Sequence, residues 1–527
     1  MIRVRQVKVP LKDKKNLRTY IEKKLKTKII DFKIIKESLD ARKKPELYFV
    51  YEVDVVLSNE NDYLKFNKSN DILLAPDESF KFEITGDKFL NDRPIIIGAG
   101  PAGLFCGYIL AQYGYKPLIV ERGEKIEERI KSVEEFWNNG NLNINSNVQF
   151  GEGGAGTFSD GKLNTLVKDK EYIGKKVFEI FIENGAPEEI LYLNKPHIGT
   201  DLLRDVIINM RNKIIKMGGT FLFNSCVTDI ILDNDKIKGV IINNEVQLLS
   251  DVVVLAIGHS SRDTFEMLYN NNIEMQSKPF AVGVRIEHPQ KMINCNQYGF
   301  DGHPDLNSAS YKLTHTTKDK RGVYSFCMCP GGYVVNASSE KEMLVVNGMS
   351  NHKRDTLNAN SAIVVTVNNK DYGDLPLDGV KFQRNLENKA YLLGNGKIPV
   401  QLFKDFKNNL NSSHFGEYTP ITKGAYTFAN LNELFPKYIS DSLKEGILVF
   451  DKKIKGFARD DAILLGIESR TSSPVKIIRN EIGEANFKGL YPCGEGAGYA
   501  GGITTSAIDG IKIAKLIAKK YKPLENK

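Results

Sequence analysis

Residues 93–123 read RPIIIGAGPAGLFCGYILAQYGYKPLIVERG, and this stretch decides the fold. A short apolar run, Ile95–Ile97, leads directly into glycines at positions 98, 100 and 103. A second apolar run, Leu118–Val120, ends at Glu121. The pattern predicts a strand, a glycine turn, a helix and a second strand, which together form a dinucleotide-binding fingerprint.

Each residue type in the fingerprint has a physical use. The first glycine permits a tight turn, the second lets the backbone approach a pyrophosphate, and the third lets the helix pack on the strand. The acid that follows by about 20 residues can accept hydrogen bonds from a ribose diol, and the helix N-terminus faces the phosphates. A glycine-rich turn in another α/β unit is the alternative. The candidate cofactor-binding residues here are Gly98, Gly100, Pro101, Ala102, Gly103, Glu121 and Arg122.

Length and composition indicate a globular protein with several domains. The 527 residues suggest three units at roughly 100 to 200 residues each, and 41% hydrophobic with 26% charged residues is ordinary for globular chains. No apolar run reaches the roughly 18 residues of a membrane span, and the N-terminus lacks the apolar core of a signal peptide. The six cysteines show neither a disulfide framework nor zinc-ligand spacing. We therefore expect a cytoplasmic protein without a metal site.

Residues 1–90 are expected to form a separate, basic unit. Lys and Arg outnumber Asp and Glu by 16 to 5 within residues 1–45, which suits nucleic acid or an acidic partner, or simply a solvated face. The segment has no RNP-type aromatic signature and no GxxG clamp. The order of elements predicts a small α+β sandwich of the ferredoxin-like kind. One helix is expected at Lys14–Lys26, and strands at Ile2–Val9, Ile29–Leu39, Leu47–Leu57 and Phe80–Ile84.

A second glycine-rich segment, GEGGAGTFSDGKLN, occupies residues 151–164. So many glycines cannot pack a core, but they allow close backbone approach to a ligand and expose N–H groups as in an anion nest. A flexible surface loop is the competing interpretation. The candidate cofactor residues here are Gly154, Gly156, Thr157, Ser159 and Lys162.

Two later segments repeat the change from an apolar run to glycine. Residues 251–257 form an apolar run that ends at Gly258, after a series of short predicted strands, and residues 489–507 predict a strand, a glycine turn and a helix. His259 follows the first of these, where a merely hydrogen-bonded histidine is the alternative to a catalytic one. No second GxGxxG exists, so a nicotinamide cofactor has no domain of its own. The candidate cofactor residues are Val227, Gly258, Arg262, Gly494, Glu495, Gly501, Gly502 and Ile503.

Residues 266–454 lose the parallel α/β rhythm. Alternating stretches separated by Gly, Asn and Pro turns predict an antiparallel sheet domain inserted into the nucleotide-binding domain. The expected organisation is an N-terminal domain over residues 1–90, a nucleotide-binding domain over 91–265 and 455–527, and a substrate domain over 266–454. Strands are expected at Ala281–Glu287, Gly322–Cys327, Gly332–Ala337 and Ile363–Val367, and helical patches near Asn385–Leu393 and Asn430–Phe435.

Together, these four glycine-containing segments resemble those of the FAD-dependent oxidoreductases with the glutathione-reductase-type flavin fold. The resemblance is strongest to a bacterial family of FAD-dependent dehydrogenase-like proteins with an added N-terminal domain. It covers nearly the whole chain, including KPFAVGVRIEHPQ, YSFCMCPGGYVVNASSE, NGMS and ESRTSSPV. It implies an α/β fold with a Rossmann-type FAD-binding domain, an inserted antiparallel β-rich substrate domain, and FAD as cofactor. Glu495 stands where the class more often has Asp, and the helix near Thr504 would direct its positive end at the flavin N1–C2 carbonyl.

The candidate catalytic residues come from the inserted region. Cys327 and Cys329, in FCMCPGG, stand two apart on a predicted strand and would share one face. They could be small packed residues, a substrate-facing thiol, or a dithiol relay. The CxxxxC motif of the disulfide reductases is missing from the first helix, where Cys106 stands alone. Arg285 could bind an anionic substrate or the flavin phosphates, or form a structural ion pair.

The leading hypothesis is therefore an FAD-dependent oxidoreductase that acts on a small or lipid-like organic substrate held between the flavin and the inserted sheet domain. NAD(P)H is a candidate transient reductant, because flavin chemistry needs a source of hydride or electrons. Two alternatives stay open. One is a flavin-dependent RNA-modifying protein that docks RNA with its basic N-terminal domain, and the other is a non-enzymatic flavin redox sensor. No membrane association is expected.

Overall fold

The computed structural model describes residues 1–67, 69–164, 167 and 169–524. The body of the molecule contains a parallel five-stranded sheet, ordered β24-β11-β5-β6-β7. Its strands are short, and the central ones are apolar because helices or other strands cover both faces. They are β5 (Ile95–Ile97), β6 (Leu118–Val120), β7 (Thr220–Leu222), β11 (Val253–Leu255) and β24 (Leu490–Pro492).

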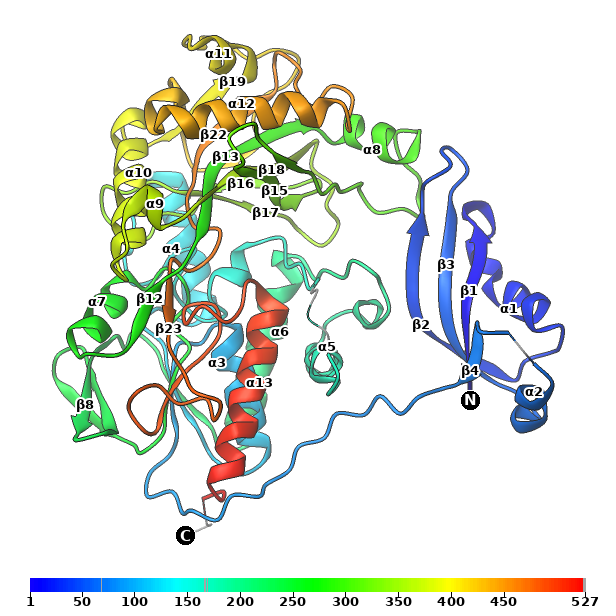
Figure 1. Ribbon diagram of the computed structural model, residues 1–527, viewed down its shortest axis with the longest axis horizontal. Helices are drawn as coiled ribbons and strands as arrows, with labels where there is room; N and C mark the ends of the chain where they lie inside the picture. Colours follow the sequence, from blue (N-terminus) through cyan, green and yellow to red (C-terminus); the bar gives the residue numbers. More distant parts are fainter. Residues whose placement is uncertain (68, 165–166, 168, 525–527) are drawn as a thin grey trace.

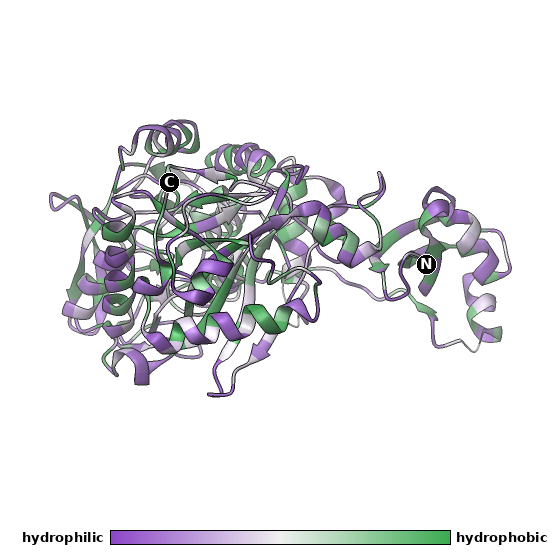
Figure 2. Cartoon of the chain, turned by 90° about the horizontal axis from the view of Figure 1, so that it is seen from above, coloured by the Kyte–Doolittle hydropathy of each residue, from purple (hydrophilic) through white to green (hydrophobic). Residues whose placement is uncertain are grey.

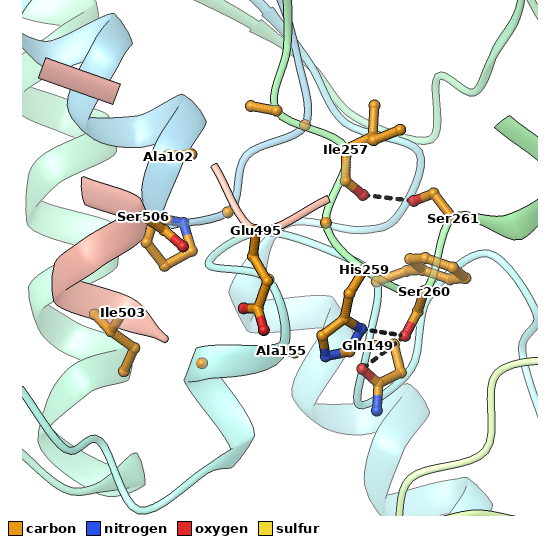
Figure 3. Close-up of a pocket in the computed structure, with 18 of the residues that line it drawn as sticks. Ala102, Gln149, Ala155, Ile257, His259, Ser260, Ser261, Glu495, Ile503 and Ser506 are labelled. Carbon is orange, nitrogen blue, oxygen red and sulfur yellow. Dashed lines mark hydrogen bonds between the residues drawn. The ribbon is translucent and has the colours of Figure 1, made fainter. Parts of the chain in front are cut away.

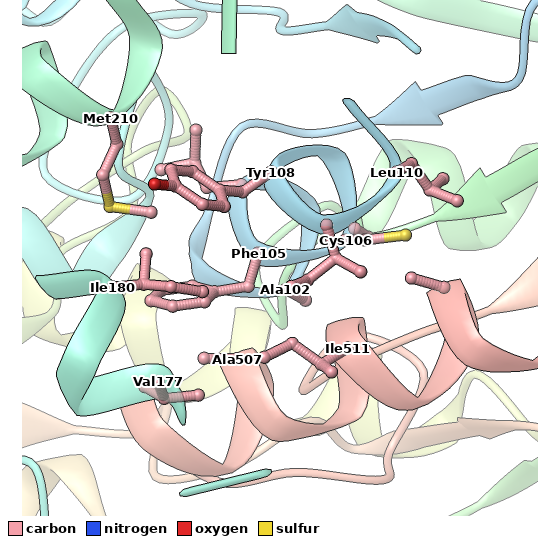
Figure 4. Close-up of a cluster of buried hydrophobic side chains, with 14 of the residues drawn as sticks. Ala102, Phe105, Cys106, Tyr108, Leu110, Val177, Ile180, Met210, Ala507 and Ile511 are labelled. Carbon is pink, nitrogen blue, oxygen red and sulfur yellow. The ribbon is translucent and has the colours of Figure 1, made fainter. Parts of the chain in front are cut away.

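A helical layer packs against this sheet and contains the largest apolar core. Phe105 and Tyr108 of α3 pack among Val177, Ile180, Met210 and Ile511 from the neighbouring helices (Figure 4). A Cβ added to Gly103 would lie 1.9 Å from the Gly98 oxygen, so only glycine allows this approach of helix to turn. The helices on this side are α3 (Pro101–Gln112), α5 (Ile173–Glu183), α6 (Thr200–Lys216) and α13 (Ile503–Lys520).

Two further groups of elements flank the parallel sheet. Helix α4 (Ile126–Asn139) precedes the second glycine-rich segment, which contains the short 3-10 helix η2 (Ala155–Phe158). A separate antiparallel sheet, ordered β10-β9-β8, is followed by β11 and then by α7 (Arg262–Asn270). Its strands are β8 (Val227–Asp233), β9 (Lys236–Ile242) and β10 (Val246–Leu249).

A seven-stranded sheet forms the upper half of the molecule (Figure 1). All its neighbouring pairs are antiparallel except β19 and β21. Strand β22 lies between β13 and β19, so the sheet extends beyond the expected boundary at residue 454. In order across the sheet, the strands are β14 (Thr314–Thr316), β15 (Gly322–Cys329), β18 (Asn358–Val367), β13 (Phe280–Pro289), β22 (Ile463–Glu468), β19 (Ile398–Leu402) and β21 (Tyr426–Phe428).

Helices and two small sheets complete the body of the molecule. The predicted helical patch at Asn430–Phe435 is only a 3-10 turn, η4 (Leu431–Leu434), and the long helix that follows it was not expected. Two small sheets pair β16 (Tyr333–Asn336) with β17 (Val346–Met349) and β20 (Thr422–Lys423), and β12 (Met275–Ser277) with β23 (Val475–Ile477). The helices are α8 (Gln290–Tyr298), α9 (Asn369–Tyr372), α10 (Asp378–Gly394), α11 (Phe403–Asn408) and α12 (Lys437–Asp451).

The N-terminal unit projects from one side of the body (Figure 2). Its antiparallel sheet has the order β2-β3-β1-β4, and two helices interrupt the strands in a β-α-β-β-α-β sequence. Contact with the body includes hydrogen bonds that the Glu37 N–H donates to the Tyr192 oxygen and the Asn194 N–H donates to the Glu37 oxygen. The elements are β1 (Ile2–Pro10), η1 (Leu11–Asn16), α1 (Leu17–Leu25), β2 (Asp31–Asp40), β3 (Tyr48–Val56), α2 (Glu60–Phe66) and β4 (Ile72–Leu74).

The strand predicted at Phe80–Ile84 is wrong, because β4 is the fourth strand. Residues 80–84 instead belong to a connecting segment that runs along the body, where the Phe82 ring stacks on Tyr113 with centroids 4.1 Å apart. Their alternating apolar residues therefore serve packing against helices. Within the described part of the chain, no helix is both long and apolar enough to cross a membrane.

Candidate functional site

One cavity gathers all four glycine-containing segments at the carboxyl ends of β5, β6, β11 and β24. This is where open parallel sheets bind ligands. Figure 3 shows part of the cavity wall, with Glu495 pointing into the space between α13 and the loop that carries His259. Sequence-predicted residues that line the cavity are Gly98, Gly100, Pro101, Ala102, Glu121, Arg122, Gly154, Gly156, Ser159, Lys162, Val227, Gly258, Cys327, Glu495, Gly501, Gly502 and Ile503.

Six predicted residues do not line this cavity: Gly103, Thr157, Arg262, Arg285, Cys329 and Gly494. Gly103 packs α3 onto the first turn, as described above. The Thr157 carbonyl accepts a hydrogen bond from the Thr200 hydroxyl at 2.5 Å, and the Gly494 N–H donates to the Asp509 carboxylate at 2.8 Å. These three residues support the cavity walls from behind.

Two helices begin at the cavity without a side-chain cap. Gly100 precedes α3, Gly502 precedes α13, and neither N-cap position supplies a side-chain hydrogen bond. The free N–H groups and the positive ends of both helix dipoles therefore suit an anionic or electron-rich ligand. A Cβ added to Gly258, Gly501 or Gly502 would meet nothing within 4 Å, so these backbones border open space that a flat ligand could fill.

Glu121 is held firmly at the cavity wall. Its side chain is buried, and its carboxylate accepts backbone N–H bonds from Ala99 (2.8 Å), Gly123 (2.9 Å) and Gly151 (3.0 Å). A carboxylate offers about four lone-pair sites, so acceptor capacity remains for a ribose hydroxyl. The second glycine-rich segment is thereby tied to the end of β6.

Two cations in the lining have buried nitrogen atoms for which the described residues supply no hydrogen-bond partner. Arg122 pairs with Asp263 at 2.7 Å and lies 4.3 Å above the Phe150 ring, yet its Nε has no acceptor among the described residues. The Lys162 Nζ also lacks an acceptor within the described chain, although it lies 3.6 Å from the Asp160 carboxylate. Buried donors are normally satisfied, so both fit a ligand that brings anionic oxygens. A dinucleotide cofactor would do so.

The two cysteines of β15 do not follow the alternation of a regular strand. The pairing with β18 shifts register between Phe326 and Cys329, and Cys327 has a φ of 42°. The prediction of a shared strand face is therefore wrong in its geometry, because a bulge turns the backbone at Cys327. Cys327 lines the cavity, while Cys329 is buried behind it and its thiol donates to the Cys327 oxygen at 3.3 Å.

The surroundings of Cys327 favour its thiolate. A hydrogen bond from the Cys329 thiol, together with the charges of Lys162 and Arg285, lowers the pKa of Cys327, although burial opposes this. The same hydrogen bond and burial raise the pKa of Cys329. The two thiols therefore have different surroundings, since Cys327 lines the cavity and Cys329 is buried behind it.

Arg285 is buried behind the cavity lining. Its guanidinium donates to the Cys327 carbonyl at 2.6 Å, the Glu468 carboxylate at 2.9 Å and the Asn360 side chain at 2.9 Å. It thus forms an ion pair with Glu468 and does not line the cavity. Its partner Glu468 does line the cavity, and burial raises the pKa of this carboxyl to about 7 in spite of Arg285. Burial likewise raises the pKa of Glu495 to about 7.

Arg262 joins the two halves of the molecule. The Glu387 carboxylate of α10 accepts hydrogen bonds from Arg262 at 2.6 Å and from Arg470 at 2.7 Å, and all three side chains are buried. Burial works against the charge of Glu387, but the two arginines outweigh it and hold its pKa well below the usual range. The network fixes α7 and α10 against the end of β22. Arg470, in turn, reaches the cavity lining.

Sequence reasoning left several lining residues out of the candidate site, although it singled out His259 as either a hydrogen-bonded or a catalytic histidine. His259 hydrogen-bonds Ser260 at 2.8 Å, and Ser260 donates to Gln149 at 3.1 Å (Figure 3). Burial lowers the pKa of His259 to about 3, so its ring is neutral. Glu468 was missed as well. Its only signal is an acid that ends the apolar strand ILLGIE.

The parallel sheet and its glycine-walled cavity define a nucleotide-binding protein of the Rossmann class. Three family models match the chain: an NAD(P)-binding Rossmann-like domain at residues 96–152, an FAD-dependent protein C-terminal domain-like model at 279–471, and a domain of unknown function at 1–56. A relative from Clostridium beijerinckii, described as an uncharacterized protein, is 49% identical over 530 residues and covers 99% of each chain. The protein belongs to the same family as this relative, a family of FAD-dependent proteins, and its cofactor is FAD.

Solved structures resemble the chain at low similarity. Glycine oxidase from Bacillus cereus is 12% identical, with a TM-score of 0.36 over 81% of this chain and 94% of that chain. Glycerol-3-phosphate dehydrogenase from Bacillus halodurans, complexed with FAD, is 12% identical, with a TM-score of 0.34 over 82% of this chain and 65% of that chain.

Proposed function

We propose that the protein is an FAD-dependent oxidoreductase that transfers hydride or electrons to or from a small organic substrate. The observation that carries the proposal is the composition of the cavity wall. Glycines at the start of α3 and α13 face the same space as Cys327 and Glu468 of the seven-stranded sheet. Bound FAD supplies redox chemistry at its flavin ring, and the second sheet supplies side chains to the same cavity.

Different residues of the chain are proposed to bind different parts of the cofactor. Glu121 accepts a ribose hydroxyl, and the N–H groups at the start of α3 bind the pyrophosphate. The start of α13, at Gly502 and Ile503, faces the flavin ring, where its positive end favours negative charge. Lys162 supplies a further cation from the second glycine-rich segment. These assignments follow from the positions of the residues in the lining.

The substrate is proposed to bind between the flavin ring and the seven-stranded sheet. Cys327 presents a thiolate there, positioned by Arg285 through the Cys327 carbonyl. Glu468, with a pKa of about 7, can hold or release a proton near neutral pH. The proposed substrate domain covers residues 266–454, and the proposed FAD-binding domain covers residues 91–265 and 455–527. Strand β22 lies in the second part of the FAD-binding domain in the sequence, but it pairs within the sheet of the substrate domain. The N-terminal domain covers residues 1–90.

Spectroscopy of the purified protein tests this function. We expect a yellow protein with a flavin absorption spectrum that dithionite bleaches. Added NADH or NADPH should reduce the flavin faster than the same mixture without a nucleotide does. A colourless protein that does not take up FAD would refute the proposal. A flavin that neither pyridine nucleotide reduces would exclude NAD(P)H as the reductant but leave the oxidoreductase open to other donors.

The structure gives no specific support to an RNA-binding role. Several basic residues of the N-terminal unit are engaged in ion pairs, including Arg3 with Asp54 at 2.8 Å and Lys24 with Asp71 at 2.9 Å. Paired charges contribute little to phosphate binding, because the bound acid repels the backbone.

A further inference from the structure

A second cavity lies behind the second glycine-rich segment, between helices α4 and α6 and the small sheet β17-β16-β20. Its volume is about 430 Å³, and it shares no lining residue with the cofactor cavity. Phe158 separates the two, since its ring lies 5.9 Å from Trp137 and 4.9 Å from the Arg204 guanidinium. Nothing in the proposed oxidoreductase function uses this space.

Arg204 is the main feature of the second cavity. It forms no ion pair with any described residue, and its Nε is buried without a hydrogen-bond acceptor in the described chain. Burial lowers its pKa, because nearby acids do not fully compensate for the lost water. Arg211, two turns further along α6, is different, since it pairs with Glu127 and with Glu152 at 2.8 Å. Arg204 thus has a buried N–H group that lacks a hydrogen-bond acceptor among the described residues.

The rest of the lining is suited to the same ligand. The Lys423 ammonium lies 5.0 Å from the centre of the Tyr333 ring and has no ion-pair partner among the described residues. Trp137 adds a second aromatic surface, and its indole N–H is already used by the Asn336 oxygen at 2.9 Å. Glu134 is the one carboxylate in the lining, and it is exposed at the rim. Two cations therefore face one acid.

We propose that this cavity binds a small organic oxyanion, a carboxylate or a phosphate ester, whose charged group sits between Arg204 and Lys423. The guanidinium gains the acceptor that it lacks, in a charge-assisted hydrogen bond. The carbon part of the ligand lies against Trp137 and Tyr333. The volume is within the range of small-molecule sites, and the site is distinct from the one that holds FAD.

Trp137 is the single tryptophan of the chain, so its fluorescence reports directly on this cavity. FAD-saturated protein, in which the cofactor occupies its own part of the first cavity, is titrated with phenyl phosphate and, separately, with benzoate at constant ionic strength, and the variants below separate binding at the second cavity from binding beside the flavin. We expect a saturable change in tryptophan emission with at least one of them, and calorimetry should give the same affinity. The arm with the stronger binding identifies the phosphate or the carboxylate as the preferred group.

Substitutions locate the binding. Arg204→Gln should weaken it by about ten-fold or more, the value of one charge-assisted hydrogen bond, and Lys423→Gln should weaken it by a smaller factor. Lys131→Gln, on the exposed side of α4 and outside the lining, is the matched control and should change nothing. Absence of saturable binding, or equal affinity in the Lys423→Gln variant and the wild type, would overturn the proposal. If Arg204→Gln does not retain FAD, the Lys423→Gln comparison decides.

Discussion

The thiolate at Cys327 leads to a sharp kinetic prediction. Iodoacetamide reacts with thiolates and not with thiols, so the rate of alkylation follows the ionised fraction. An ordinary cysteine with a pKa of about 8.5 loses roughly 75-fold of its thiolate between pH 8 and pH 6. The Cys329 hydrogen bond and the neighbouring cations lower the pKa of Cys327, so most of its thiolate should persist at pH 6. The ratio of its two rates should be close to one.

The assay follows modification of the Cys327 peptide in the FAD-loaded protein by mass spectrometry. Steric shielding by the cofactor slows both reactions equally and therefore cancels in the ratio. A short cysteine-containing peptide added to the same reaction provides the reference for an ordinary thiol. In Cys329→Ser, a hydroxyl replaces the thiol donor, and the ratio should stay below that of the peptide. In Cys329→Ala, which removes the donor, the ratio should rise clearly toward that of the peptide. A wild-type ratio equal to that of the peptide would refute the reasoning about the Cys327 thiolate.

Three further predictions concern stability and cofactor retention. Glu387→Gln removes the carboxylate that Arg262 and Arg470 share, so that Arg470 loses this ion pair and Arg262 keeps only its pair with Glu340. The change should cost about 3 to 5 kcal/mol, measured as a lower thermal midpoint, and an unchanged midpoint would show that the network is not buried as described. Gly103→Val must displace α3, because an added Cβ lies 1.9 Å from the Gly98 oxygen; FAD bound per chain should fall, whereas Gly302→Ala, which meets nothing within 4 Å, should retain it. Burial raises the pKa of Glu287 to about 8, so the folded protein holds a proton that the unfolded chain releases. The free energy of unfolding should therefore fall as pH rises from about 4.5 to about 8. Glu287→Gln should flatten that decline, and parallel plots of unfolding free energy against pH for the two proteins would contradict the prediction.

The part of the cofactor site formed by residues 95–121 could be predicted because its residues lie close together in the sequence. The strand, the three glycines and Glu121 lie within a single stretch, and each residue type has one geometric use there. The pattern of glycine and apolar runs also located the other three segments. Their convergence on one cavity follows from the parallel sheet, whose strand ends all meet at the same edge.

The remaining features of the site and fold depend on contacts between residues that are far apart in the sequence, which a local pattern cannot indicate. Cys327 leaves the regular strand because its carbonyl bonds to Arg285, a residue far away in the chain. Glu468 reaches the cavity because β22 inserts between β13 and β19. At Phe80–Ile84, alternation typical of a strand instead reflects packing on helices, since the period of two alone does not identify the surface that is covered.

The residues that line the cofactor cavity come from segments before, within and after the seven-stranded sheet in the sequence, from Ile97 to Ser506. During synthesis, a nascent chain that has emerged only as far as β22 can complete that sheet but still lacks β24 and the start of α13. FAD loading must therefore follow translation of these last elements, and a product that stops before Gly501 should be unable to retain the flavin.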